Sequence, residues 1–296
     1  MTDTKPTILI VDDTTTNVAI LSACLKNDYQ LLTTSNGDQC LEVTKINPNL
    51  DLILLDIEMP GMSGYETCRA LKANPDTADI PIIFVTANLE IKSEEKGFSL
   101  GAVDYITKPI HPPLVAARVK THVTLKIQKD KLEKLALFDQ LSGLYNRHYI
   151  LNSAKLKISS AHRHKHPVSL LMMDIDHFKS INDNHGHPAG DSVIKAVSKV
   201  IDKECRADDI ASRFGGEEFA VLLCHCDKQS AKAKAEKIRK KIEKLKPVGI
   251  PTTVSIGLSE IESEEDSFTD MLDRADKALY QAKNQGRNKV VSYFPN

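Results

Sequence analysis

Five short apolar runs separated by helical patterns constrain the fold of this chain more tightly than any other feature. The runs are rich in Ile, Leu and Val, and they occupy residues 7–11, 30–34, 52–55, 82–86 and 103–107. Patterns with helical spacing lie between successive runs, at residues 17–26, 37–46, 64–73 and 90–100. Near-continuous apolar strands joined by helices are typical of a doubly wound parallel sheet, so this part is predicted to be α/β. Ser63 and Glu66 form the sequence pattern of a capping box before the third helix.

Polar side chains stand where these strands end. Asp12 and Asp13 follow the first run, Asp56 follows the third, Thr86 closes the fourth and Lys108 follows the fifth. The carboxyl ends of parallel strands meet along one edge of the sheet, where α/β proteins bind ligands. Carboxylates gathered there call for a hard cation, so Mg²⁺ or Mn²⁺ is predicted, and Lys108 would help it to counter the charge of a phosphoryl group on Asp56. Ordinary turn and cap residues explain each position alone, but they explain all five together poorly.

The run Asp-Ile-Glu-Met-Pro-Gly-Met-Ser-Gly at residues 56–64, with the Lys-Pro pair that follows the fifth strand, makes residues 1–122 similar to the receiver domain of two-component response regulators. The resemblance implies that Asp56 is the phosphoacceptor and that a sensor histidine kinase or a phosphotransfer protein supplies the phosphoryl group. It further implies that a metal ion is bound by Asp12, Asp13, Asp56 and the Glu58 backbone carbonyl, and that Lys108 contacts the phosphoryl group. Thr86 and Tyr105 would be the residues that change position on phosphorylation. The Lys108–Pro109 bond is expected to be cis.

Composition sets broad limits on the rest of the chain. The length of 296 residues suggests about two domains, and the 41% hydrophobic and 27% charged content is that of a soluble globular protein. Because no apolar run approaches the roughly 20 residues of a membrane span and no signal-peptide pattern opens the chain, we expect a cytoplasmic protein without membrane contact. The acidic first half suits a cation site and the mildly basic second half suits a phosphate-bearing ligand, but the charge pattern is not one of DNA binding. The six cysteines favour reduced, buried thiols over a disulfide framework.

Residues 111–141 are predicted to form one extended linker helix. Two prolines can open it, and no Gly or Pro follows until Gly143. Apolar residues near heptad spacing are Leu125, Leu132 and Leu135, with His122 and Gln128 interrupting them. A coiled coil between two chains and a solvated spacer helix both remain open.

The second half is organised around the run Arg-Phe-Gly-Gly-Glu-Glu-Phe at residues 213–219. Strand-like residues flank Gly215 and Gly216, and glycine takes the positive φ angles of a tight turn, so a β-hairpin with a Gly-Gly loop is predicted. Glu217 and Glu218 are then expected at the start of the return strand with their side chains on opposite faces. An ordinary turn beside a charged edge is the alternative.

A second carboxylate follows an apolar strand at residues 168–173, where the chain continues with Asp174. Asp174 joined by Glu217 from the hairpin would provide oxygen ligands from two separate strands. That arrangement commonly seats Mg²⁺ against a triphosphate.

These motifs, with the segments at 139–147, 174–183, 190–191, 280–283 and 286–288, make residues 138–296 similar to a GGDEF-type diguanylate cyclase with Glu217 at the family's Asp position. The resemblance implies an α/β domain with a central, mostly antiparallel, palm-like sheet. The catalytic residues that it implies are Asp174, Lys179, Glu217 and Glu218, and the metal ligands are Asp174, Glu217 and the Ile175 carbonyl. GTP would be bound by Asn182 and Asp191 at its guanine and by Lys179, Lys283 and Arg287 at its phosphates.

The implied reaction condenses two GTP into cyclic di-GMP with release of two pyrophosphates, under control of phosphorylation in the receiver. Because one such site would hold one GTP, two domains must face each other, and a homodimer or larger assembly becomes part of the catalyst. Arg206 and Asp209 match the family's inhibitory RxxD pattern, with Lys237 where an arginine is expected, so cyclic di-GMP is expected to inhibit its own synthesis. A surface ion pair is the alternative for Arg206 and Asp209.

Two alternatives to this function stay open. One is a catalytically silent module that binds GTP or cyclic di-GMP and acts through partners, which the intact carboxylates and basic residues disfavour. The other is a cyclase of a different nucleotide, which Asn182 and Asp191 disfavour.

Two further motifs carry less weight. The histidines at residues 162–166 could bind a metal, but they are expected in a polar loop before Pro167. The Cys-His-Cys run at residues 224–226 lacks a second pair of ligands and is expected to end a strand.

Overall fold

The structure is a computed structural model that describes residues 5–47, 49–87, 97–263 and 265–294. The chain divides into two compact units, Met1–Leu132 and Glu133–Asn296. Of the helix expected at residues 90–100, residues 90–96 lie outside the described part.

The first unit contains a five-stranded parallel sheet with the order β2-β1-β3-β4-β5. Its strands are β1 Thr7–Val11, β2 Gln30–Thr34, β3 Leu52–Asp56, β4 Ile82–Thr86 and β5 Asp104–Thr107. The helices of this unit include α1 Thr15–Leu25, α2 Gly37–Ile46, α3 Gly64–Ala73 and the first part of α5 Pro112–Leu137. The prediction of a doubly wound parallel sheet is confirmed, and so are the Ser63–Glu66 capping box and the cis Lys108–Pro109 bond.

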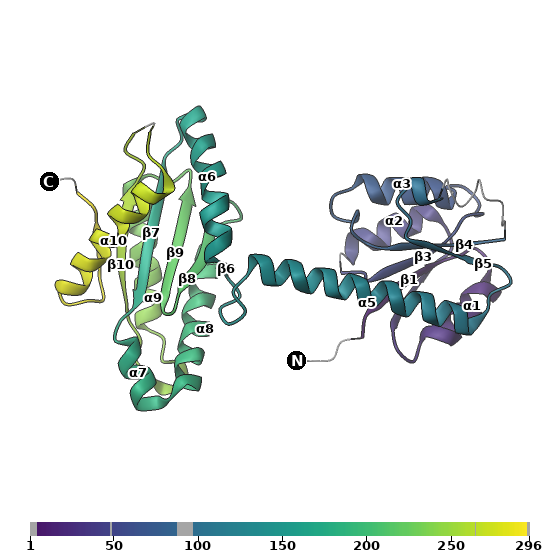
Figure 1. The fold of residues 1–296 in the computed structure, drawn as a ribbon, viewed down its shortest axis with the longest axis horizontal. Coiled ribbons are helices and arrows are strands. Elements are labelled where there is room, and N and C mark those ends of the chain that lie inside the picture. The colour runs from purple at the N-terminus through teal and green to yellow at the C-terminus, as the bar shows by residue number, and fades with distance from the viewer. Residues whose placement is uncertain (1–4, 48, 88–96, 264, 295–296) are drawn as a thin grey trace. The chain divides into compact units, whose positions relative to one another are not determined.

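Helices lie on both faces of this sheet (Figure 1), and each face builds a separate hydrophobic core. Ile8 and Ile10 of β1 pack with α1 and α5 on one face, whereas Leu9 and Val11 pack with α2 and α3 on the other. Successive side chains of a strand alternate between faces, so a strand covered on both sides must be apolar throughout. The carboxyl ends of the strands are thereby held in fixed positions along one edge.

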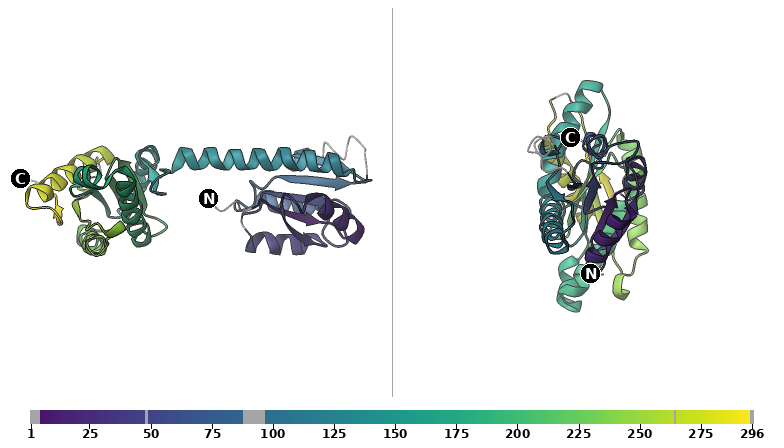
Figure 2. Two further views of the ribbon diagram at one scale, coloured as in Figure 1. Left: turned by 90° about the horizontal axis from the view of Figure 1, so that it is seen from below. Right: turned by 90° about the vertical axis from the view of Figure 1, so that its right-hand side faces the viewer.

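Helix α5 is one continuous element of 26 residues (Figure 2). Its Val115, Val119 and Val123 are buried against the five-stranded sheet. Leu125 and Leu132 lie beyond that contact and are 55% and 66% exposed. An extended helix is confirmed, although it ends at Leu137 and not at residue 141 as predicted. The choice between a coiled coil and a spacer helix stays untested. No helix in the described ranges has the length and apolar character that a membrane crossing requires.

The second unit contains a six-stranded mixed sheet with the order β11-β10-β7-β9-β8-β6. Its strands are β6 Tyr145–Asn146, β7 Val168–Ile175, β8 Ile210–Gly215, β9 Glu218–Cys224, β10 Val254–Glu260 and β11 Val290–Ser292. Its helices are α6 Arg147–His164, α7 Phe178–His185, α8 His187–Glu204, α9 Lys228–Glu243 and α10 Phe268–Asn284, with a 3₁₀ turn at Pro247–Gly249. The four central strands pair antiparallel and both edge strands pair parallel, which confirms the mostly antiparallel sheet.

Helices cover both faces of this sheet as well (Figure 1). Leu171 and Met173 of β7 join the core under α7, α8 and α9, while Leu170 and Met172 join the core under α6 and α10. By the same alternation, the side chain of Asp174 is directed to the α10 side of the sheet. The strand register therefore determines which side chains lie next to the Asp174 carboxylate.

The hairpin differs by one residue from its prediction. Gly215 pairs with Glu218, so the two-residue turn consists of Gly216 and Glu217, and Glu217 does not belong to the return strand. The pairing shifts between Arg213 and Gly215, which leaves one extra residue in β8. Gly216, at φ +47°, takes the left-handed conformation for which glycine was expected.

The histidine-rich segment also differs from its prediction, since His162 and His164 belong to the last turn of α6 and not to a loop. Ile158 and Ala161 are buried, so the apolar face of the helix continues up to them. The helix ends at His164, and the C-cap residue Lys165 adopts the left-handed conformation. Cys224 ends β9, as expected.

Candidate functional site

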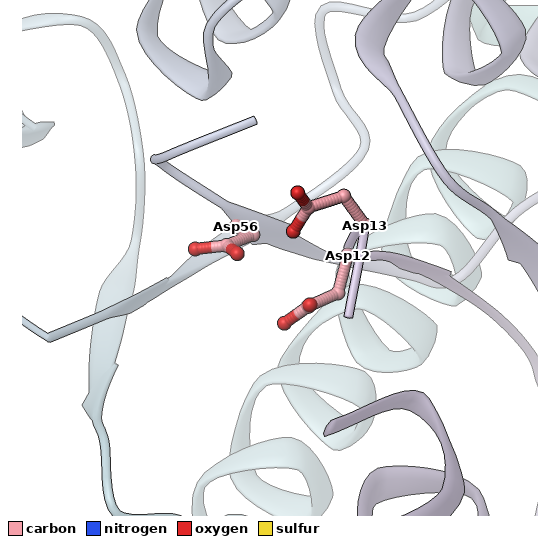
Figure 3. Close-up of side chains that lie close together, drawn as sticks. All are labelled: Asp12, Asp13 and Asp56. Carbon is pink, nitrogen blue, oxygen red and sulfur yellow. The ribbon is translucent and has the colours of Figure 1, made fainter. Parts of the chain in front are cut away.

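The receiver residues meet at the carboxyl ends of β1 and β3. Carboxylate oxygens of Asp12, Asp13 and Asp56 lie within 4.8 Å of one another (Figure 3). Asp12 and Asp56 are buried and Asp13 is exposed, so the cluster opens to solvent on one side. Such a set of hard oxygen donors fits Mg²⁺ or Mn²⁺, and the ion's identity is not shown.

Lys108 connects two of these carboxylates. Its Nζ lies 2.7 Å from Asp56 Oδ2 and 3.2 Å from Asp12 Oδ2. Burial and the charge of Asp12 nevertheless hold the pKa of Asp56 above its ordinary value, although the Lys108 hydrogen bond opposes this. A bound cation would relieve that crowding, which supports the metal prediction.

The other predicted receiver residues surround this cluster. Thr86 is buried at the end of β4, and Tyr105 lies on β5 beside Phe98 and under the guanidinium of Arg118 from α5. The Glu58 backbone N–H donates to Asp56 Oδ1 at 3.4 Å. The roles of Thr86, Tyr105 and Glu58 stay predictions.

The carboxylates of the second unit face each other across neighbouring strands. Asp174 of β7 is paired directly with Glu218 of β9, and both side chains are directed to the face covered by α10. Glu217 lies in the adjoining turn, and its backbone carbonyl accepts from the Ile175 N–H at 3.3 Å. Like charges directly opposite each other destabilise a sheet, so this arrangement favours a cation between the strands.

One basic residue from α10 reaches this acidic group. Lys283 Nζ lies 2.7 Å from Asp174 Oδ2. Burial is the main cause that raises the pKa of Asp174, with Lys283 lowering it and Glu217 raising it further. Burial and the charges of Asp174 and Asp276 likewise raise the pKa of Glu218. Among the described residues, a group of three carboxylates within 4.8 Å of one another is found at Asp12, Asp13 and Asp56, so cation binding by Asp174 and Glu217 stays a prediction.

The predicted guanine-binding residues lie on consecutive helices. Asn182 is on α7, and its Oδ1 is buried without a hydrogen-bond partner. A Cβ added at Gly190 of α8 would lie 2.0 Å from that oxygen, so the absence of a side chain there leaves room for the amide. Asp191 follows at the exposed surface. An unsatisfied buried acceptor is costly, and the contact of this amide with guanine stays a prediction.

The predicted phosphate-binding residues are accessible to solvent. Lys179, in the first turn of α7, is exposed, as is Arg287 just beyond α10. Lys283 is partly buried through its ion pair with Asp174. A phosphate would therefore have to compete with Asp174 for Lys283.

The three predicted inhibitory residues line one pocket of about 350 Å³. The Asp209 carboxylate accepts from the Arg206 backbone N–H at 2.9 Å and from Lys234 Nζ at 2.6 Å. Lys237 is paired with Glu204 at 2.9 Å. Asp209 is therefore ion-paired with Lys234, and its role toward a ligand stays a prediction.

Sequence reasoning missed several residues that shape these groups. Asp276 is one of them: it lies seven residues before the predicted Lys283 on α10, and this two-turn spacing could have placed it beside Glu218 as well. Lys234 lies one turn before Lys237, but nothing in the sequence pairs it with Asp209. Asn17 was also missed, and its amide donates to Asp12 at 3.0 and 3.1 Å.

Comparison with known families agrees with this geometry. Residues 136–289 match the family described as diguanylate cyclase, GGDEF domain, and residues 8–120 match the response regulator receiver domain. The chain belongs to the GGDEF family.

Curated relatives share one or both units. Response regulator PleD of Caulobacter vibrioides is 32% identical over 302 residues, which cover 96% of this chain and 65% of PleD. Diguanylate cyclase VdcA of Vibrio cholerae is 44% identical over 175 residues, which cover 56% of this chain and 50% of VdcA. The chain thus spans between half and two thirds of the length of these two relatives.

A solved structure resembles the second unit. The coiled coil and GGDEF domain of DgcB from Caulobacter crescentus, solved in complex with c-di-GMP, matches with a TM-score of 0.54 and 29% identity. The match covers 60% of this chain and 98% of that chain.

Proposed function

We propose that this protein is a phosphorylation-regulated diguanylate cyclase that condenses two GTP into cyclic di-GMP. The observation that carries the proposal is the direct pairing of Asp174 with Glu218, beside Lys283 and the turn that contains Glu217. A buried acidic group with one lysine is suited to a divalent cation and a polyphosphate, and relatives named diguanylate cyclase share the domain.

In this proposal, each GTP is held at both ends. The unpartnered Asn182 Oδ1 accepts a hydrogen bond from guanine, and Asp191 accepts from the ring N–H and the exocyclic amine. Lys179, Lys283 and Arg287 contact the phosphates. Asp174, Glu217 and the Ile175 carbonyl would hold Mg²⁺ or Mn²⁺, which supplies Lewis-acid polarisation of the α-phosphate when bound.

The chain's own residues then serve the displacement at phosphorus. The 3′-hydroxyl of one GTP attacks the α-phosphate of the other, and pyrophosphate leaves. Glu218, whose pKa is raised by burial and by Asp174 and Asp276, accepts the hydroxyl proton. Lys283 neutralises charge that develops on the phosphate oxygens.

Two copies of the chain are needed, because each site holds one GTP and the ring closes only after both hydroxyls have attacked. The exposed leucines of α5 would pair two chains as a coiled coil. Phosphorylation of Asp56 by a kinase or phosphotransfer protein shifts the receivers toward the arrangement in which the two GGDEF domains meet. Cyclic di-GMP bound at Arg206, Asp209 and Lys237 would inhibit the enzyme.

The test uses purified protein with GTP and Mg²⁺, with and without a small-molecule phosphodonor, and identifies the product by mass. We expect cyclic di-GMP and two pyrophosphates per product molecule, formed faster with the phosphodonor. A silent effector module would bind GTP or cyclic di-GMP without turnover. That result, obtained with folded protein at saturating Mg²⁺, would refute the proposal.

A further inference from the structure

Asp176 is buried beside the GGDEF site, and the proposed reaction gives it no role. It lies two residues after Asp174, just past the end of β7, and is 4% exposed. Its Oδ1 accepts from Ser255 Oγ at 2.7 Å, and its Oδ2 accepts from Thr253 Oγ1 at 2.7 Å and from the Asn288 backbone N–H at 3.1 Å. Both oxygens are engaged by protein donors, so Asp176 is poorly suited to be a metal ligand.

The N–H of Asn288 belongs to a backbone segment that needs support from outside. Gly286, Arg287 and Asn288 have φ angles of +103°, +62° and +47°. Residues with a side chain rarely adopt this left-handed region in succession, because Cβ then crowds the backbone. The Arg287 N–H donates to the Ala282 carbonyl at 3.0 Å, which attaches the segment to α10. Asp176 provides the attachment to β7.

The side chain of Asn288 attaches the same segment to α9. Its Nδ2 donates to Glu243 Oε1 at 2.6 Å, and its Oδ1 accepts from Arg239 Nη1 at 2.7 Å. The backbone around Arg287 is therefore held by three elements, while Arg287 itself is exposed. A fixed backbone limits where the guanidinium can be, without restraining the side chain directly.

We propose that Asp176 is a positioning residue that fixes Arg287 relative to Asp174. This inference rests on the proposed function, in which Arg287 binds phosphate and Asp174 binds the cation on the same triphosphate. Since Asp174 and Asp176 are two residues apart, one strand end holds both the cation ligand and the backbone of the phosphate-binding arginine. The distance between cation and arginine is thereby set by the strand.

The first test needs no activity. Asp176→Ala removes both acceptor oxygens, so all three donors lose their partner, the Asn288 backbone N–H among them. We expect hydrogen exchange of the backbone amides at residues 286–289 to accelerate about tenfold or more, with the amides of β9 unchanged. Unchanged exchange at residues 286–289 would overturn the inference.

The second test measures kinetics in a double-mutant cycle. We expect Asp176→Ala to raise KM for GTP by roughly tenfold and to lower kcat less, because ground-state phosphate binding is weakened. Arg287→Ala alone and the double variant should then differ by less than twofold, since both remove the same contact. Fully multiplicative effects, or an altered Mg²⁺ requirement in Asp176→Ala, would assign Asp176 to another role and reject the proposal.

A matched pair of serine variants controls for loss of a buried hydroxyl on β10. Ser255→Ala removes a donor to Asp176, whereas Ser259→Ala removes a donor to the Met271 carbonyl. We expect only Ser255→Ala to raise KM, and equal effects would contradict the inference. If the wild-type protein forms no cyclic di-GMP, the proposed function fails, while the exchange experiment still decides whether Asp176 holds the segment.

Discussion

The receiver site and the GGDEF site both bring carboxylates together around one lysine, but on sheets of different topology. In the receiver, Asp12 and Asp56 come from parallel strands whose carboxyl ends share an edge, and Lys108 contacts both. In the GGDEF domain, Asp174 and Glu218 come from antiparallel strands and are paired side by side beside the hairpin turn.

The difference lies in what the lysine does. Lys108 lies within 3.2 Å of both receiver carboxylates, so the receiver cluster is tied together before any cation binds. Lys283 contacts Asp174, while burial and then the charges of Asp174 and Asp276 raise the pKa of Glu218. The proposed phosphoacceptor Asp56 thus lies beside a positive charge that contacts both receiver carboxylates, whereas the lysine of the GGDEF site contacts Asp174.

The largest expected effect separates the two sites by function. Asp174→Asn should reduce cyclic di-GMP formation by about 10³-fold, because it removes a charged cation ligand next to the reacting phosphate. The measurement is initial rate at saturating GTP and Mg²⁺, with Asp273→Asn, an exposed carboxylate of α10, as the control. Turnover within tenfold of wild type would mean that Asp174 does not hold the cation.

The corresponding receiver variant should change regulation and leave the chemistry intact. Asp56→Asn should abolish an activation by phosphodonor that we expect to be about tenfold, while basal turnover remains. Exposed Asp76 offers the control Asp76→Asn, which should respond like wild type. Full stimulation of Asp56→Asn would disprove the switch.

Asp209, in the pocket with Arg206 and Lys237, differs from the carboxylates of both sites because Lys234 pairs with it outside either site. If the pocket binds cyclic di-GMP chiefly through the neighbouring arginine, Arg206→Ala should raise the concentration for half-inhibition about tenfold without changing the uninhibited rate. Inhibition curves at fixed GTP measure this. An unchanged curve would remove Arg206 from the inhibitory site.

The smallest expected effect concerns stability. Burial first, and then nearby negative charges, raise the pKa of Glu218 in the folded protein. Above that pKa the ionised carboxylate therefore lowers the free energy of unfolding. This loss of stability disappears when the pH falls below the pKa that Glu218 has in the unfolded chain. Glu218→Gln should therefore raise Tm by a few degrees at pH 7 without metal, and have little effect near pH 4. Thermal melts at both pH values, with Asp273→Asn beside them, test this. A lower Tm of the variant at pH 7 would show that the ionised Glu218 carboxylate does not destabilise the folded protein.

The sequence predicted the receiver more completely than the GGDEF site for a physical reason. In a parallel sheet, every strand end lies on the same edge, so Asp12, Asp56 and Lys108 could be placed together from strand order alone. In an antiparallel hairpin, partners depend on register, and the extra residue between Arg213 and Gly215 shifted the turn onto Glu217. The direct pairing of Asp174 with Glu218 followed from that register and was not foreseen.

Side-chain contacts between residues far apart in the chain could not be predicted from the sequence either. Lys234 pairs with Asp209, which lies 25 positions earlier in the chain. Asp176 accepts from Asn288, which lies 112 positions later. Neither pair has a periodic pattern that marks it. Helix α6 extended through His162 and His164 because its buried face continued, which outweighed the polar character of the segment.

The most direct test of the central claim is the position of a cation in a crystal grown with Mn²⁺ and a non-hydrolysable GTP analogue, located by anomalous scattering. We expect an ion bound by Asp174 and Glu217 against the triphosphate, with Lys283 moved from Asp174 to a phosphate oxygen, and a second ion among Asp12, Asp13 and Asp56. Bound nucleotide with no ion at Asp174, and with Lys283 still on that carboxylate, would contradict the account.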